Sequence, residues 1–302
     1  MFTLGICMGL ATALIQSFSY LFSAWFVKSY RSGLRLLVAS NIVMGCITLP
    51  ILPFVLPDLL SKGKILPFCL FLLLWMGVFA AGQGTFFALL RKMESSRASS
   101  LLGFKILFLA FLYMGINQTI LNLWQLAAVL LCTIAGVAIN WSGGKKFTAE
   151  GLFWLCMTVI FYCFADMVET RLVTLPASGN IIKDSFAVSV ICYAVMGIGT
   201  LPFLWKIKIN GAMLLKAAPF SIAWYLSQVT LYIAFGTVGT VFGNVLMSFR
   251  GVLSVVLGAI AAAMGLTALE SKLPGRLWIR RGICAVLMAG AIILYSFATL
   301  KG

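Results

Sequence analysis

The sequence predicts an all-α membrane protein whose ten transmembrane helices form two inverted five-helix repeats. Three observations support this fold class: an apolar composition, ten apolar segments, and polar residues that recur at matched positions in the two halves. The chain is 62% hydrophobic and 10% charged, with a mean hydropathy of +1.09, whereas a soluble domain carries about 25% charged residues. A lipid bilayer is therefore the expected solvent.

Ten segments are long enough to cross a bilayer, because about 20 apolar residues span a hydrocarbon core roughly 30 Å thick. In chain order they run over 3–27, 34–56, 65–90, 96–116, 121–140, 150–173, 185–205, 212–236, 240–266 and 277–299. They divide into a first repeat, 1–146, and a second repeat, 147–302. Because five is an odd number of crossings, the second repeat is expected to enter the membrane from the opposite side.

A repeated phrase supports this division. "VMGCITLP" begins at Val43 and "VMGIGTLP" begins at Val195, and six of their eight positions are identical. Each copy holds a Gly, which permits close helix contact, and a Pro, which allows a helix to bend. We interpret them as packing and hinge positions rather than as ligands: Gly45 and Pro50, Gly197 and Pro202.

Polar residues also recur in register. Gln83-Gly-Thr85 and Gln228-Val-Thr230 lie 145 residues apart, and the same offset carries Phe104-Lys105 onto Phe249-Arg250. Trp124 and Ala135-Gly136 similarly match Trp278 and Ala289-Gly290. A polar side chain is costly at bilayer depth, so matched polar positions are more informative than matched apolar ones. They indicate an internal repeat, which must be recognised before a fold is assigned.

The first segment of each half carries a polar stripe. Side chains at i, i+4 and i+7 share one helix face, and a polar face at membrane depth must contact protein or water. We expect both stripes to face one cavity. Their members are Gln16, Tyr20 and Ser23 and, shifted by 146 positions, Tyr162, Asp166 and Glu169.

Two carboxylates lie within one turn of the second stripe. Asp166 and Glu169 repel each other, so one of them is expected to bind and release a proton near neutral pH, as a proton or cation coupling site. The alternative is that Glu169 lies near the membrane edge, paired with a base or solvated. We assign function to Asp166 and favour the edge position for Glu169.

Lys105 and Arg250 are the symmetric cations of the fourth and ninth predicted spans. Arg250 lies ten residues into its segment, roughly 15 Å deep at 1.5 Å per residue, too far to reach water easily. It is expected to contact the substrate or a gate, with a structural ion pair as the alternative. For Lys105 the two interpretations stay equally open.

Two glutamines and one tryptophan complete the candidate substrate-binding set. Gln83 and Gln228 can donate and accept hydrogen bonds, or can simply bond neighbouring helices. Trp224 shares the face of Gln228, as do Tyr225 and Tyr232, which predicts a wall for an organic solute. Aromatic residues at span ends are interpreted instead as interfacial anchors: Trp75 and Trp205.

The positive charges predict sidedness rather than nucleic-acid binding. Connectors after the odd-numbered spans hold 15 Lys and Arg against 5 on the opposite side, so both termini are expected to be non-cytoplasmic. The basic residues are scattered, with no basic helix interleaved with aromatic residues. All eight Cys fall within predicted spans and are interpreted as apolar packing. His is absent, and we expect no metal, cofactor or enzymatic activity.

Three local patterns resemble the drug/metabolite transporter superfamily, in particular its EamA-like ten-helix branch. "ALLRKMESSRASSLL" (Ala88–Leu102) is similar to that family's junction between the third and fourth helices. "MGLTALE" (Met264–Glu270) resembles the end of its ninth helix, and "GICAVLMAGAIIL" (Gly282–Leu294) its Gly-rich last helix. Asn117 departs from the family pattern, which has a glutamate there. The sidedness is closer to that of the rhamnose-transporter-like branch.

The resemblance implies a secondary transporter of small organic solutes that works by alternating access, without ATP hydrolysis. It places the cavity between the two halves, with the fifth and tenth helices peripheral. We expect an exporter or facilitator of an amino acid or similar zwitterionic metabolite, located in the bacterial inner (plasma) membrane, with proton coupling and a homodimer as open options. A carrier of neutral sugars, whose charges serve only as internal salt bridges, is the first alternative. A membrane enzyme acting on lipid-linked substrates is the second, less favoured because no convergent His, Asp or Cys cluster is found.

Overall fold

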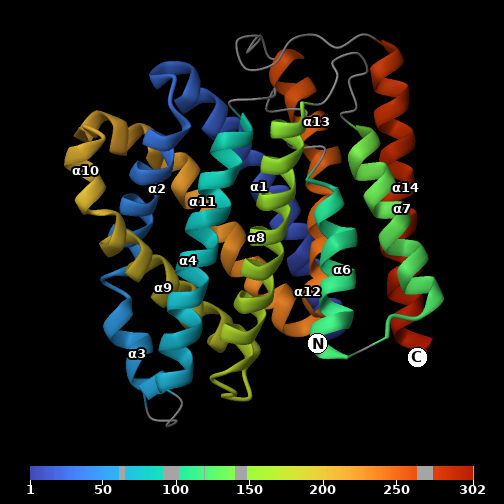
Figure 1. The fold of residues 1–302 in the computed structure, drawn as a ribbon, viewed down its shortest axis with the longest axis horizontal. Coiled ribbons are helices and arrows are strands. Elements are labelled where there is room, and N and C mark those ends of the chain that lie inside the picture. The colour runs from blue at the N-terminus through green and yellow to red at the C-terminus, as the bar shows by residue number, and fades with distance from the viewer. Residues whose placement is uncertain (61–64, 91–101, 119, 140–147, 264–274, 302) are drawn as a thin grey trace.

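The computed structural model describes the chain except for residues 61–64, 91–101, 119, 140–147, 264–274 and 302 (Figure 1). The described part consists of α-helices and short connections, without a β-strand. The expectation of an all-α chain is therefore confirmed over this part.

The helices follow the predicted segments in order. In the first half they are α1 (Phe2–Tyr30), α2 (Gly33–Thr48), α3 (Leu52–Leu60), α4 (Ile65–Leu90), α6 (Phe104–Asn117) and α7 (Leu123–Ile139). In the second half they are α8 (Ala149–Thr174), α9 (Ile181–Thr200), α10 (Pro202–Lys206), α11 (Gly211–Val238), α12 (Thr240–Ser248), α13 (Arg250–Ala263) and α14 (Gly275–Lys301).

Five of the described helical segments are long and apolar enough to cross a membrane: Phe2–Tyr30, Ile65–Phe86, Ala149–Thr174, Ile181–Thr200 and Gly282–Leu300. Shorter apolar helices lie between them: Gly33–Thr48, Phe104–Ile116, Leu123–Ala138 and Thr240–Leu253. These lengths and compositions are compatible with a multi-pass membrane protein.

Three predicted segments are interrupted. The helix expected over 34–56 ends at Thr48 and resumes at Leu52, and the one expected over 185–205 ends at Thr200, before Pro202. Proline cannot donate the backbone hydrogen bond that continues a helix, and Pro50 and Pro202 lie at these two breaks. The segment expected over 240–266 breaks at Phe249, so Arg250 begins α13 instead of lying within an unbroken helix. Residues 96–101 and 264–266 of the predicted spans lie outside the described residues.

The helices pack as pairs drawn from the two halves of the chain. The pairs α1 with α11, α4 with α8, α2 with α9, and α7 with α14 have extensive contacts. Figure 1 shows α7 and α14 along one side of the bundle, α2, α3, α9 and α10 along the other, and both termini at the same end. The central helices between these flanks are the ones that carry the candidate polar residues.

The two copies of the repeated phrase contact each other between α2 and α9. A Cβ atom placed on Gly45 would lie 2.8 Å from Cα of Gly197, and one placed on Gly197 would lie 2.5 Å from Cα of Gly45. Both distances are far shorter than a van der Waals contact, so only glycine permits this approach. The packing role expected for Gly45 and Gly197 is therefore met, and each is the other's partner.

Candidate functional site

One cavity of about 250 Å³ lies among the central helices. Its walls come from α1, α2, α4, α6, α8, α11, α12 and α13. All ten residues that the sequence analysis proposed for substrate binding line it: Gln16, Tyr20, Gln83, Lys105, Tyr162, Asp166, Glu169, Trp224, Gln228 and Arg250. Ser23, the third member of the first stripe, lines it as well.

The described lining of the cavity extends towards one end of the bundle. On α1 its lining runs from Gln16 to Val27, and on α2 it begins at the first residue, Gly33; this end is opposite the chain termini (Figure 1). Towards the termini, threonine pairs join the helices below the cavity. Oγ1 of Thr12 lies 2.8 Å from Oγ1 of Thr230, and Thr170 and Thr240 make the same contact at 2.7 Å.

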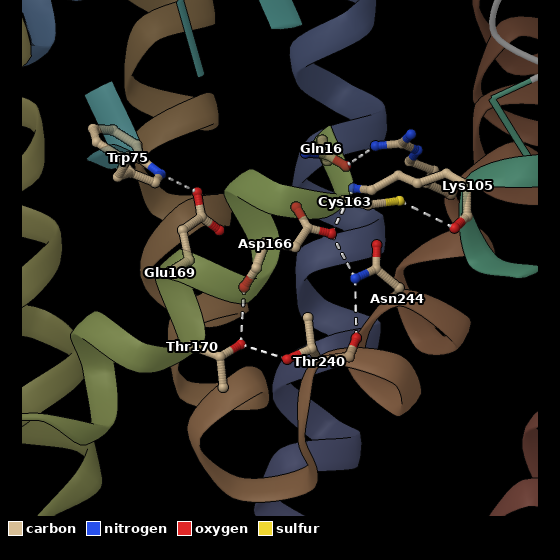
Figure 2. A network of polar contacts seen from close by, with 10 residues as sticks. Gln16, Trp75, Lys105, Cys163, Asp166, Glu169, Thr170, Thr240 and Asn244 are labelled. Atoms are coloured by element: carbon tan, nitrogen blue, oxygen red, sulfur yellow. Dashed lines mark hydrogen bonds and ion pairs between the residues drawn. The ribbon is translucent and has the colours of Figure 1, made fainter. Parts of the chain in front are cut away.

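Lys105 and Asp166 form an ion pair at the wall of this cavity. Nζ of Lys105 lies 2.6 Å from Oδ2 of Asp166, and the two side chains are 12% and 10% exposed. Asn244 of α12 is buried and donates its amide to the same oxygen at 2.7 Å (Figure 2). The Lys105 ammonium also lies 5.8 Å from the ring centre of Tyr162. This pair leaves one positive and one negative charge mutually neutralised.

Arg250 has a different set of partners. Its guanidinium donates to Oε1 of Gln16 at 2.5 Å and lies 5.6 Å from the ring centre of Tyr20. Its backbone carbonyl accepts a hydrogen bond from Ser17 of α1. Among the described residues, no carboxylate lies within salt-bridge distance of Arg250. A half-buried cation therefore faces the cavity with only neutral neighbours.

Glu169 is the second acidic residue at the cavity, and it has no cationic partner among the described residues. It is 4% exposed and accepts a hydrogen bond of 2.8 Å from Nε1 of Trp75 (Figure 2). In the described part of the chain, no Lys or Arg nitrogen lies within salt-bridge distance of Glu169. Two expectations are wrong here, because Glu169 is buried rather than at a solvated edge, and Trp75, which is fully buried, is no interfacial anchor.

Aromatic residues and amides complete the wall. Trp224, Phe79, Phe86 and Phe220 line the cavity together with Gln83 and Gln228. Nε1 of Trp224 donates to the hydroxyl of Tyr193 at 3.2 Å, which fixes its ring. The expectation that Tyr225 and Tyr232 share this wall is wrong, because both are buried away from the cavity, and Tyr225 instead contacts Ser189 of α9.

Sequence reasoning missed two asparagines. Asn41 of α2 is buried and lines the cavity, and Asn244 holds Asp166 from behind. The available signal was a single Asn within a long apolar helix, which is costly there unless its amide has a partner. Neither is matched by an identical residue at the repeat offsets, so the comparison of the two halves passed over them.

The chemistry of the wall suits a small dipolar solute. The volume lies below the range of about 300–1,000 Å³ typical of sites for drug-sized ligands. It combines apolar and aromatic surface with a guanidinium and a carboxyl group, neither of which has an ion-pair partner among the described residues. Within the described residues, no group of three or more His, Cys, Asp or Glu side chains could hold a metal ion.

Comparisons with known proteins establish the fold alone. No protein family's sequence profile matches the chain, and no curated protein is similar to it in sequence. Among solved structures, 29 chains are similar. One of them, described only as the crystal structure of a protein, aligns with 100% of this chain over 99% of its own length, with a TM-score of 0.70 and 13% sequence identity. The helical arrangement therefore occurs in an experimentally solved protein.

Proposed function

We propose that this chain is a secondary transporter of a small zwitterionic organic solute, such as an amino acid. The observation that carries the proposal is that one cavity holds a guanidinium and a carboxyl group without ion-pair partners among the described residues. Arg250 offers a guanidinium to an anionic group and Glu169 offers a carboxylate to a cationic one. Burying a charge is costly unless it is paired, so a solute with both charges is the ligand that completes this site.

While Asp166 is ionised, the remaining charges do not compete for that solute. Lys105 and Asp166 neutralise each other at 2.6 Å, which is the internal salt bridge that a neutral-sugar carrier would also need. Such a carrier, however, gains nothing from an additional unpaired cation and an additional unpaired anion in its binding cavity. This difference favours a zwitterion over a neutral sugar.

The transporter would have ten spans in two inverted repeats of the drug/metabolite type. Several contacts support this architecture. Gly45 and Gly197, which occupy equivalent places in the two halves, approach each other directly. The helix pairs α1 with α11 and α4 with α8 are those that a two-fold relation between halves would generate. Both termini lie at one end of the bundle, as an even number of crossings requires (Figure 1).

Alternating access is the transport mechanism that the cavity supports. It reaches the end of the bundle that carries Lys28, Arg31 and Arg35, while threonine contacts close the other end. Because basic connectors remain cytoplasmic, the conformation described is the one that faces the cytoplasm. A C-terminal reporter that is active only in the cytoplasm should then stay inactive, and a strong signal would reverse the orientation.

A matched ligand series tests the function. The purified protein is reconstituted in liposomes and supplied with radiolabelled L-alanine, its amide-capped cation, its N-acetylated anion, and a neutral sugar. Uptake or thermal stabilisation restricted to zwitterions supports the proposal. An equal response to the sugar would indicate the alternative carrier, and a response to neither class, after screening the other L-amino acids, would contradict a zwitterion transporter.

A further inference from the structure

We propose that Lys105, Asp166 and Asn244 form a proton-binding switch in which a proton on Asp166 releases Lys105 to bind the solute's anionic group. This inference rests on the proposed transport function and adds the coupling ion and the residues that couple it. The three side chains come from α6, α8 and α12 and meet at a single oxygen, Oδ2 of Asp166. The switch is therefore centred on one atom.

The ion pair explains why a proton would act here. Lys105 lies at the cavity wall, but its ammonium is held by Asp166 rather than offered to a ligand. A proton taken from cavity water onto Oδ2 converts Asp166 to a neutral acid, while Lys105 keeps its charge. The net charge of the cluster then rises from zero to plus one. The carboxylate of a solute restores neutrality, so the proton and the solute favour each other's binding.

Asn244 provides the second, independent observation. Its amide nitrogen donates to Asp166 and to the carbonyl of Thr240, at 2.7 and 3.0 Å. Its amide oxygen is buried and has no hydrogen-bond partner. An amide can donate with its nitrogen or accept with its oxygen. Rotation by half a turn would bring that unpartnered oxygen to Asp166, where it could accept the proton of the acid form.

The unpartnered oxygen distinguishes this cluster from a simple structural brace. A brace for a permanently ionised aspartate needs donors only, and a Lys with one further donor would be sufficient. A buried acceptor without a donor is instead costly in the state described, and protonation of Asp166 would satisfy it. Asn244 thus has a hydrogen-bonding function in both protonation states of Asp166.

Other charged and titratable groups share the cavity with Asp166. Its own helix contributes Tyr162 and Glu169, and the facing helices contribute Lys105, Arg250 and Tyr20. Cys163 of α8 is buried outside the cavity, where its thiol contacts the backbone carbonyl of Lys105. Gln83 of α4 and Gln228 of α11 line the same cavity but do not titrate. Glu169 is the competing proton acceptor, since it is also a carboxylate in this cavity, and the test must separate the two.

The switch has a path to the closed end of the bundle. The backbone carbonyl of Asp166 accepts from Thr170, whose hydroxyl contacts that of Thr240, one turn before Asn244 on α12 (Figure 2). The contacts that would change on protonation therefore adjoin a threonine pair that joins α8 to α12. Rotation of the Asn244 amide would break its bond to the Thr240 carbonyl and so loosen this junction on the side away from the cavity.

Infrared spectroscopy of the purified protein tests the proton site without any solute. Spectra recorded across a pH series should show the carbonyl band of a protonated carboxylic acid growing as the pH falls. The component of this band that belongs to Asp166 should be lost in Asp166→Asn, shifted in Asn244→Leu, and retained in Glu169→Gln. Asp184→Asn serves as the matched control, because Asp184 bonds the backbone of Ser178 outside the cavity. An Asp166→Asn spectrum in which no part of the wild-type band is missing overturns the proposal.

Solute binding tests the coupling. Affinity for an equimolar mixture of L-amino acids should rise as the pH falls, by up to about tenfold per pH unit, because two ligands that favour each other do so reciprocally. In Asp166→Asn the affinity should become independent of pH and match that of the wild type at low pH. If this variant does not fold, the double variant Lys105→Gln/Asp166→Asn, which strands no charge, replaces it in the infrared test. A pH-independent affinity of the wild type would overturn the coupling, whereas absence of binding at every pH, with the Asp166 band present, would contradict the transport function and leave the proton site supported.

Discussion

Lys105 and Arg250 occupy the same place in the two halves of the chain, and each contacts a pair of residues four positions apart on another helix. Lys105 contacts Tyr162 and Asp166 of α8, and Arg250 contacts Gln16 and Tyr20 of α1. The two pairs are themselves related by the offset of 146 residues. The positions that contact the two cations are therefore repeated, but the negative charge of Asp166 has no counterpart at Tyr20.

That difference assigns separate functions to the two cations. Asp166 neutralises Lys105, so removing either partner leaves the charge of the other buried and unpaired. Arg250 has an amide and a phenol instead, so its charge remains for a ligand. A repeat that duplicates positions while changing their side chains has thus produced an ion pair that stabilises one wall and a cation without an ion-pair partner on the other. Four substitutions test this assignment, from the largest expected effect to the smallest.

Lys105→Ala should destabilise the protein most. It leaves the carboxylate of Asp166 without its cation, and breaking a buried ion pair in this way costs about 3–5 kcal/mol. The measurement is the free energy of unfolding, or the melting temperature, of the purified protein. Adding Asp166→Asn should recover most of the loss. If the two substitutions instead have additive effects on the free energy of unfolding, the Lys105–Asp166 pair does not stabilise the fold.

Arg250→Ala should weaken binding of a zwitterionic solute by about 10- to 150-fold, the range expected for a hydrogen bond to a charged group worth about 1.5–3 kcal/mol. Its stability should change far less than that of Lys105→Ala, because no carboxylate is stranded. Arg250→Lys should restore binding only in part, since a point charge replaces a planar guanidinium. Titration calorimetry and thermal melting of the same samples separate the two effects. A stability loss as large as that of Lys105→Ala would indicate that Arg250 stabilises the fold instead of binding the solute.

Gln16→Glu should give Arg250 an ion-pair partner, as Asp166 already is for Lys105. The guanidinium already contacts Oε1 of Gln16, so a carboxylate at that position would neutralise Arg250 without moving the backbone. Binding of an anionic group should fall by about tenfold or more, since one charge-assisted hydrogen bond is worth about 1.5–3 kcal/mol. The fold should stay as stable as that of the wild type. Unchanged affinity in equilibrium binding would show that Arg250 does not contact the solute.

Trp75→Phe should have the smallest effect, confined to the Glu169 side of the cavity. It removes the indole donor that orients Glu169 while retaining an aromatic ring in the core. Affinity for a zwitterion should fall by about three- to tenfold, because the lost bond is worth about 1 kcal/mol. Affinity for an N-acetylated anion should be unaffected, because that ligand has no cationic group for Glu169 to contact. Trp205→Phe is the matched control, since Trp205 is 80% exposed and does not line the cavity. Equal losses for both ligands would contradict a role for Glu169 in binding the cationic group.

The sequence predicted much of this arrangement from one physical rule. A polar side chain in an apolar helix must face protein or water, so ten residues on six predicted spans could be assigned to one cavity before any contact was known. Apolar length likewise predicted where helices run. Pro50 and Pro202 were interpreted as hinges within unbroken spans, whereas the helices end at these two positions. The repeated phrase indicated close packing, although not that Gly45 and Gly197 contact each other.

Only the tertiary structure determined which charge is paired with which. The partners lie far apart in the chain, as with Arg250 and Gln16, which are separated by 234 residues. A helix rotation of one residue, about 100°, would have brought different side chains together. Composition and periodicity place residues on a face but do not set the rotation and height of one helix against another, which depend on packing such as the glycine contact between α2 and α9. For this reason the sequence identified Asp166, Glu169, Lys105 and Arg250 as candidates, and the packing of the helices paired two of them and left the other two unpaired.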